Sequence, residues 1–203
     1  MPKVSREHIE KRKSEILEAA LTVFSRKGFE PTTMRDIVEE SGMSRGGVYQ
    51  YFSSPEEMLE AIHERNIHRT ADFVRELLSQ NETVWGALED YLAEISGESR
   101  YAMVIYEYSM TSWRNERHRR FMNNVVRGSF QAFEALLQQG VDNGEFRPTQ
   151  SLDAIVSFLI NVGDGLSFQA SILGNEAAHV QEQVEGLKIY LRTVLQVREE
   201  PRI

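Results

Sequence analysis

The chain contains no cysteine, only five prolines and only two tryptophans in 203 residues. Without cysteine there can be no disulfide framework, no thiolate nucleophile and no thiolate metal ligand. No apolar run approaches the roughly 18 residues that a membrane span requires, and residues 1–14 are polar rather than signal-like. We therefore expect a cytoplasmic protein without a membrane partner.

The residue sets that mark common enzymes and metal sites are also missing. The sequence shows no glycine-rich phosphate loop and no serine or threonine beside a histidine–acid pair. His63 and His68 lie five positions apart, so they do not share a helix face as zinc ligands would. We expect no enzymatic activity, no metal and no cofactor.

Charge is distributed unevenly along the chain. The net charge of −8 by itself argues against a nucleic-acid partner. Residues 1–52, however, hold nine Lys and Arg against eight Asp and Glu, whereas residues 53–203 hold fourteen against 23. The first 28 residues are more basic still and include Lys11-Arg12-Lys13. This pattern is compatible with DNA bound at one end, and also with the solvated start of a helix.

Apolar residues recur at helical spacing almost throughout, and the alternation typical of strands is absent. We predict an all-α fold of about nine helices. The first helix is expected from Arg6 to Gly28, a typical C-terminal glycine. Thr33 and Asp36 have the spacing of a capping box and open a short second helix toward Glu40.

The next signals define a third and a fourth helix. Ser44 is a suitable cap for a third helix of eight residues. Ser54 and Pro55 predict a long fourth helix that runs to about Leu78. Later helices are expected near residues 82–96, 100–114, 116–142, 150–173 and 178–197, with a break at Gly97-Glu98.

The second and third helices, joined by a glycine-bearing turn, predict a helix-turn-helix module. Val48 and Phe52 lie four residues apart and share one face of the third helix. The matching core is expected from Ile16, Ala20, Phe24, Ile37 and Val38. Such a short helix is held by packing, and its other face presents polar groups.

Residues Ile16–Leu59, "ILEAALTVFSRKGFEPTTMRDIVEESGMSRGGVYQYFSSPEEML", resemble the DNA-binding domain of the TetR/AcrR family of transcriptional regulators. The resemblance implies a helix-turn-helix DNA-binding domain over residues 1–53. It further implies a helical domain for effector binding and dimerisation over residues 54–203. Downstream of the first domain, only the length, the helical content and the phrase Asp164-Gly165-Leu166 are similar to the family.

The resemblance also implies DNA contacts in the first domain. Arg35 matches a position that reaches a base, and Thr33 matches a cap that contacts phosphate. The recognition helix is implied to dock through Ser44, Arg45, Gly46, Gly47, Tyr49, Gln50 and Tyr51. The chemistry agrees, because arginine can pair with guanine, glutamine with adenine, and tyrosine hydroxyls with phosphate.

Each of these assignments has an alternative. Arg35 has the spacing to pair with Glu39 instead, and Tyr49 or Tyr51 can be half-buried packing residues. Pro55 stands where many relatives have a lysine, so one phosphate contact is expected to be missing or supplied elsewhere. The adjacent glycines 46 and 47 predict a close approach of the backbone to DNA, with fewer base contacts than usual.

The second domain is rich in aromatic residues and methionine, and the family commonly binds a small effector there. We predict a partly apolar pocket, for which core packing is the alternative at every position. Its expected lining is Tyr106, Glu107, Met110, Trp113, Phe133, Phe158 and Asn161.

The family also forms a four-helix bundle between two subunits through its last two helices. The apolar stripes expected at this interface are Ile155, Leu159, Val162 and Leu166, and Leu187, Leu191 and Val194. A homodimer would place two recognition helices about 34–36 Å apart on a palindromic operator in double-stranded DNA. We predict a ligand-responsive repressor of this kind. The alternative is an effectorless DNA-binding adaptor or architectural protein that is regulated by protein partners.

Overall fold

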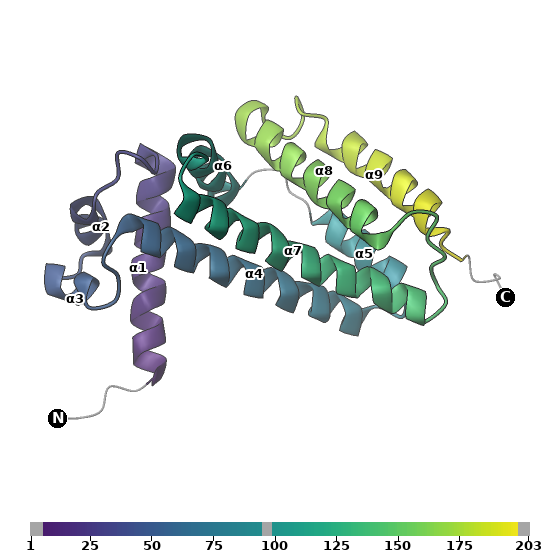
Figure 1. Cartoon of the computed structure of the whole chain (residues 1–203), viewed down its shortest axis with the longest axis horizontal. Helices are drawn as coiled ribbons and strands as arrows, with labels where there is room; N and C mark the ends of the chain where they lie inside the picture. Colours follow the sequence, from purple (N-terminus) through teal and green to yellow (C-terminus); the bar gives the residue numbers. More distant parts are fainter. Residues whose placement is uncertain (1–5, 95–98, 199–203) are drawn as a thin grey trace. The chain divides into compact units, whose positions relative to one another are not determined.

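The computed structural model describes residues 6–94 and 99–198, without the side chains of Ser112 and Val125. This part of the chain is all-helical and contains no strand (Figure 1). Its helices are α1 Arg6–Lys27, α2 Met34–Ser41, α3 Arg45–Tyr49, α4 Pro55–Gln80, α5 Val84–Ala93, α6 Arg100–Ser112, α7 Glu116–Asp142, α8 Leu152–Leu173 and α9 Val180–Leu195. The prediction of an all-α fold of about nine helices is confirmed.

Local caps explain most of the helix boundaries. The side chain of Thr33 accepts a hydrogen bond from the backbone N–H of Asp36, and the carboxylate of Asp36 accepts one from the N–H of Thr33, which confirms the capping box. The third helix is shorter than the expected eight residues and ends at Tyr49. The expected break at Gly97-Glu98, and the end of the helix expected near residues 82–96, lie outside the described residues.

The chain forms two compact units. The head unit comprises Met1–Asn66 and Arg100–Met122, and the body unit comprises Ile67–Ser99 and Asn123–Ile203. Helices α4 and α7 each contribute residues to both units. The expected boundary at residue 53 follows the sequence motif, whereas the units follow the packing; that boundary stays a prediction.

The head unit has its own apolar core. The expected core residues of α1, α2 and α3 are buried, with Ile16, Ala20, Ile37 and Val48 at 0% exposure. Helix α6 completes this core with Val104, Ile105 and Tyr108. Val38 is the exception, because it packs against the core but remains half-buried.

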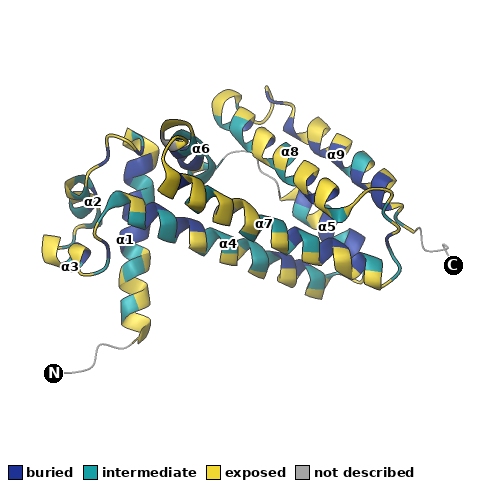
Figure 2. Cartoon of the chain, in the orientation of Figure 1, coloured by how far each residue is buried: buried dark blue, intermediate teal, exposed yellow. Residues whose placement is uncertain are grey.

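The body unit has a second apolar core, formed by the C-terminal half of α7 with α5, α8, α9 and Val74 of α4 (Figure 2). The carboxylate of Glu145 accepts hydrogen bonds from the N–H groups of Val84 (2.9 Å) and Trp85 (2.7 Å), which satisfies the start of α5. Among the described residues, α8 is the single helix long and apolar enough to span a membrane by length and composition. It lies beside α9 instead and buries Ile155, Leu159 and Leu166 in this core.

Candidate nucleic-acid interface

Helices α2 and α3 form a helix-turn-helix. Gly42 ends α2 in the left-handed conformation, with φ +63°, which glycine adopts without strain. The hydroxyl of Ser44 then accepts a hydrogen bond from the N–H of Gly47 at 3.1 Å and starts α3. Val48 and Phe52 hold α3 from behind, at 0% and 5% exposure. The opposite face of α3 is therefore fixed in place and open to solvent.

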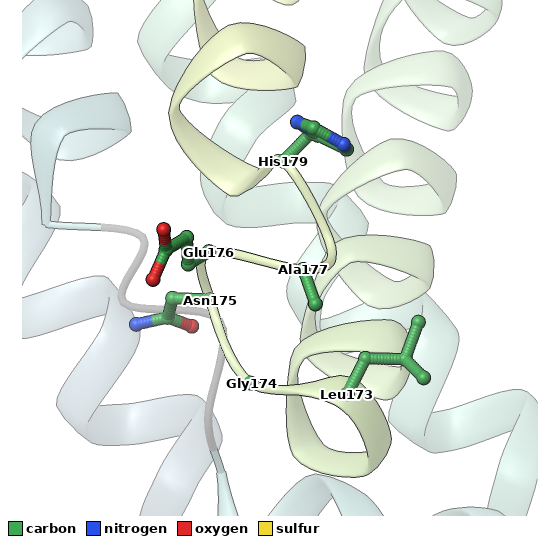
Figure 3. Close-up of a pocket in the computed structure, with 6 residues that line it drawn as sticks. All are labelled: Leu173, Gly174, Asn175, Glu176, Ala177 and His179. Atoms are coloured by element: carbon green, nitrogen blue, oxygen red, sulfur yellow. The ribbon is translucent and has the colours of Figure 1, made fainter.

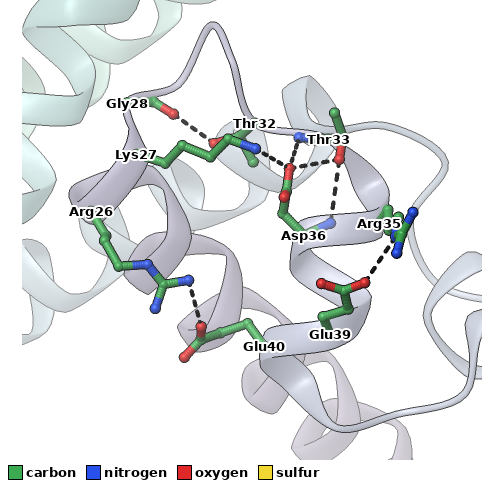
Figure 4. Close-up of polar contacts among 9 residues, drawn as sticks. All are labelled: Arg26, Lys27, Gly28, Thr32, Thr33, Arg35, Asp36, Glu39 and Glu40. Atoms are coloured by element: carbon green, nitrogen blue, oxygen red, sulfur yellow. Dashed lines mark hydrogen bonds and ion pairs between the residues drawn. The ribbon is translucent and has the colours of Figure 1, made fainter.

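A polar network fixes the start of α2 (Figure 4). The carboxylate of Asp36 accepts hydrogen bonds from the ammonium group of Lys27 (2.6 Å), the hydroxyl of Thr33 (2.6 Å) and the N–H of Thr33 (2.8 Å). These three donors, Lys27 first, hold the pKa of Asp36 well below its usual range. The hydroxyl of Thr33 is thus part of a cap, and its contact with phosphate stays a prediction.

Arg35 pairs with Glu39 on the surface of α2. The Nε–Oε1 distance is 2.8 Å, and the side chain of Arg35 is 87% exposed (Figure 4). The hydrogen bond and charge of Glu39 raise the pKa of Arg35. The alternative of an intrahelical ion pair is therefore present in the structure. An exposed pair of this kind is weak, so it leaves the guanidinium group available to a competing acceptor.

A concavity with a volume of about 200 Å³, which we call the α2–α3 groove, lies on this face of the helix-turn-helix. Its lining is Arg35, Val38, Arg45 and Tyr49. The guanidinium carbon of Arg45 lies 5.1 Å from the centre of the Tyr49 ring, within the range of a cation–π contact. The groove thus combines two cations, a phenol and one aliphatic side chain. Arginine and tyrosine groups are the types that read base edges and phosphates.

The other predicted DNA contacts lie around this groove. Gln50 is exposed, whereas Tyr51 is half-buried and packs against the core of the head unit. A Cβ atom added at Gly46 would have no atom within 4 Å, and one added at Gly47 would lie 3.2 Å from the hydroxyl of Ser44. A side chain at position 47 would therefore crowd the cap of α3, while nothing in the described chain requires glycine at 46.

Glu107 of α6 contacts the loop between α1 and α2. Its Oε1 accepts hydrogen bonds from the backbone N–H of Phe29 (2.9 Å) and Glu30 (3.4 Å). Gly28, with φ +88°, precedes this loop, and a Cβ atom there would lie 2.8 Å from the same oxygen. Glu107 thus ties α6 to the helix-turn-helix. Its expected role in a ligand pocket stays a prediction.

The remaining predicted pocket residues do not form one group within either unit. In the head unit Tyr106 is half-buried, while Met110 and Trp113 are 72% and 56% exposed. In the body unit Phe133 is buried in the core, and its ring lies 4.8 Å from that of Tyr91. The other two predicted residues of that unit, Phe158 and Asn161, are exposed.

A separate concavity of about 540 Å³ lies at the turn between α8 and α9 (Figure 3). It contains none of the predicted pocket residues. Its lining is Leu173, Gly174, Asn175, Glu176, Ala177 and His179. These residues all lie between positions 173 and 179, so the turn itself forms this surface. Within the turn, the backbone of His179 adopts the left-handed conformation with φ 49°.

The predicted dimer residues mostly lie inside the single chain. Six of the seven are buried in the core of the body unit, and Val162 is half-buried beside them; the six are Ile155, Leu159, Leu166, Leu187, Leu191 and Val194. The exposed apolar residues of the same helices are Phe158, Ile172, Leu173 and Ile189. The assignment of the seven residues to an interface stays a prediction.

Sequence reasoning missed two features of the head unit. These are the position of Val38 in the lining of the α2–α3 groove and the contact of Glu107 with the loop before α2.

Comparisons with known proteins agree with this architecture. Residues 16–62 match the family described as "Bacterial regulatory proteins, tetR family", and residues 87–181 match "Tetracyclin repressor-like, C-terminal domain". The HTH-type transcriptional regulator YfiR of Bacillus subtilis is 45% identical over 205 residues, which cover 98% of each chain. The HTH-type transcriptional repressor KstR2 of Mycolicibacterium smegmatis is 27% identical, over 73% of this chain and 74% of its own.

A solved structure has the same fold. FadR of Bacillus subtilis in complex with stearoyl-CoA has a TM-score of 0.69 and 17% identity, over 86% of this chain and 96% of that one. The helix-turn-helix, the two family matches and the full-length similarity to YfiR point to one assignment. The chain belongs to the TetR family of helix-turn-helix transcriptional regulators.

Proposed function

We propose that this chain is a cytoplasmic, ligand-responsive repressor that binds an inverted-repeat operator as a homodimer. A small, partly apolar effector would release it from DNA. The observation that carries the proposal is the α2–α3 groove, in which Arg35 and Arg45 lie on the solvent face of a helix-turn-helix whose other face is buried.

The groove suits direct readout of bases. Arg45 projects from the first position of α3, where the N-terminus of a recognition helix meets base edges. Arg35 has only an exposed ion pair with Glu39 to give up, so guanine is a competitive partner. The 42%-exposed Tyr49 is suited to bind phosphate through its hydroxyl.

The exposed surface of α8 and α9 supports a dimer. Phe158 and Ile189 are 43% and 69% exposed, and the ring of Phe158 lies 4.2 Å from that of Tyr190. Exposed apolar residues of this size, gathered on two adjacent helices, are typical of a protein interface. We therefore propose that these residues lie in the dimer interface, in addition to the seven predicted from the sequence.

Two relatives support a repressor that responds to an apolar effector. KstR2 is named a repressor, and FadR was solved with stearoyl-CoA. Within the head unit, Glu107 supplies a route for the response, since a shift of α6 would pull on the loop before α2. Release requires only a modest difference in effector affinity between the two states, about 1–3 kcal/mol for a 5- to 150-fold change.

The proposal is tested by selecting bound fragments from the genome of the source organism and footprinting them. We expect protection of an inverted repeat whose half-sites are centred about 34–36 Å apart. Binding without any preference over random DNA would overturn the proposal that the protein recognises a specific operator. A thermal-shift screen against fatty acids, acyl-CoA thioesters and other amphipathic compounds tests the effector. An operator-binding protein that no compound releases would favour the effectorless adaptor.

A further inference from the structure

Val38 occupies an unusual position in the α2–α3 groove. Among the described residues that line that concavity it is the only aliphatic side chain, and the others are Arg35, Arg45 and Tyr49. Its neighbour Ile37 is completely buried in the core of the head unit. Val38 is half-buried, so part of its surface faces the groove.

An apolar surface in the same groove as two arginines has a specific counterpart in the major groove of DNA. The thymine 5-methyl group is the apolar feature that distinguishes one base edge there from the other three. Aliphatic side chains recognise it by van der Waals contact, while neighbouring arginines take the O6 and N7 atoms of guanine. The groove of this chain has both chemistries side by side.

We propose that Val38 is a specificity-determining residue that receives the 5-methyl group of a thymine in each operator half-site. This inference rests on the proposed DNA-binding function. The methyl group would lie in the groove that Arg35 and Arg45 also line, so we expect the thymine next to a guanine that one of them reads. Contact with Val38 adds no hydrogen bond, and its contribution comes from removing two apolar surfaces from water.

The test uses the whole protein and the operator fragment obtained by selection. Each thymine of one half-site is replaced in turn by uracil, which removes only the methyl group and keeps every hydrogen-bonding atom. We expect one position, next to a guanine, at which uracil weakens binding about 3- to 10-fold, the effect of burying about one methyl group. Replacing the same thymine by cytosine should weaken binding, and 5-methylcytosine should recover part of it.

The variant Val38→Ala should bind thymine and uracil operators equally, because its side chain no longer reaches the methyl group. Val126→Ala, at an exposed position of α7, is the matched control and should keep the discrimination. The uracil series leaves the protein unaltered, so it gives a result even if Val38→Ala unfolds. Specific operator binding with no thymine-dependent position would overturn the inference alone, whereas absence of any operator would overturn the proposed function.

Discussion

The side-chain carboxylate of Glu107 accepts a hydrogen bond of 2.9 Å from the backbone N–H of Phe29, which lies 78 residues away in the chain. Around this hydrogen bond the ring of Phe29 packs edge-on against Tyr108, with centroids 4.6 Å apart. The contact closes the loop that sets the start of α2. It is therefore both a structural element of the head unit and the link between α6 and the helix-turn-helix.

We expect Glu107→Ala to destabilise the protein by about 1–3 kcal/mol, because it leaves the part-buried N–H of Phe29 without an acceptor. Glu107→Gln keeps one carbonyl acceptor and should lose less. Urea unfolding followed by circular dichroism measures both. Glu64→Ala, at an exposed position within α4, is the control. Equal stability of Glu107→Ala and the control would show that the contact is not needed for folding.

Gly46→Ala separates folding from DNA binding. Nothing lies within 4 Å of the added Cβ atom, so the variant should be as stable as the wild type or up to about 1 kcal/mol more stable. If the backbone of α3 approaches DNA closely at this point, operator affinity falls, because the added methyl group occupies space that the DNA requires. Ser79→Ala, at an exposed position near the end of α4, is the control and should leave affinity unchanged. Fluorescence anisotropy measures the affinity of each variant for the selected operator. Full affinity in Gly46→Ala would refute a close approach of the α3 backbone to DNA.

Arg45→Ala and Tyr49→Phe should have different effects on recognition. Loss of Arg45 removes a base contact, which costs about 1–3 kcal/mol and relaxes sequence preference at one position. Tyr49→Phe keeps the ring beneath Arg45 and removes only the hydroxyl, so it should weaken all sequences alike. Binding to a library of single-base operator variants distinguishes the two patterns. Retained preference in Arg45→Ala would assign base readout to Arg35 or Gln50.

Ile189→Glu should dissociate the proposed dimer. The side chain is 69% exposed in the single chain, so a carboxylate is tolerated in the monomer but not in an apolar interface. Sedimentation at micromolar concentration should show a dimer for the wild type and a monomer for the variant, with weaker binding to the inverted repeat. Val126→Glu, 55% exposed on α7, serves as control. A dimeric Ile189→Glu would exclude this residue from the interface.

His63 makes the head unit sensitive to acid. It is 5% exposed, contacts the hydroxyl of Tyr101 and leaves Nε2 without a partner. Desolvation lowers its pKa to about 4 from 6.5. Below pH 6.5 the unfolded chain takes up a proton that the folded chain does not, so stability falls between pH 6.5 and 4, by at most about 3 kcal/mol.

Urea unfolding at a series of pH values tests this expectation. The variant His63→Phe cannot be protonated, and its unfolding free energy should change less over the same pH interval than that of the wild type. His118 is also buried and its pKa is also lowered by desolvation, so some pH dependence should remain. Identical pH profiles for His63→Phe and the wild type would refute the assignment.

The sequence by itself determined that the chain is helical and where several of its helices begin, although α3 ends earlier than predicted. The capping interactions join residues three or four apart, as between Thr33 and Asp36, Ser44 and Gly47, or Ser54 and Glu57. Interactions this local depend on the order of residues and little else. Periodicity likewise predicted the core of the head unit, because Ile16, Ala20 and Phe24 lie on one face of α1.

The tertiary structure decided what covers each apolar face. Leu159 and Leu191 have the periodicity expected of a subunit interface, yet both are buried in the core of one chain. An apolar helical stripe has the same sequence pattern whether it packs against its own chain or against a second subunit. Only packing could show that Val38 faces the groove while Ile37 faces the core. The partner of Glu107 was equally beyond reach, since a hydrogen bond across 78 residues leaves no periodic signal in the sequence.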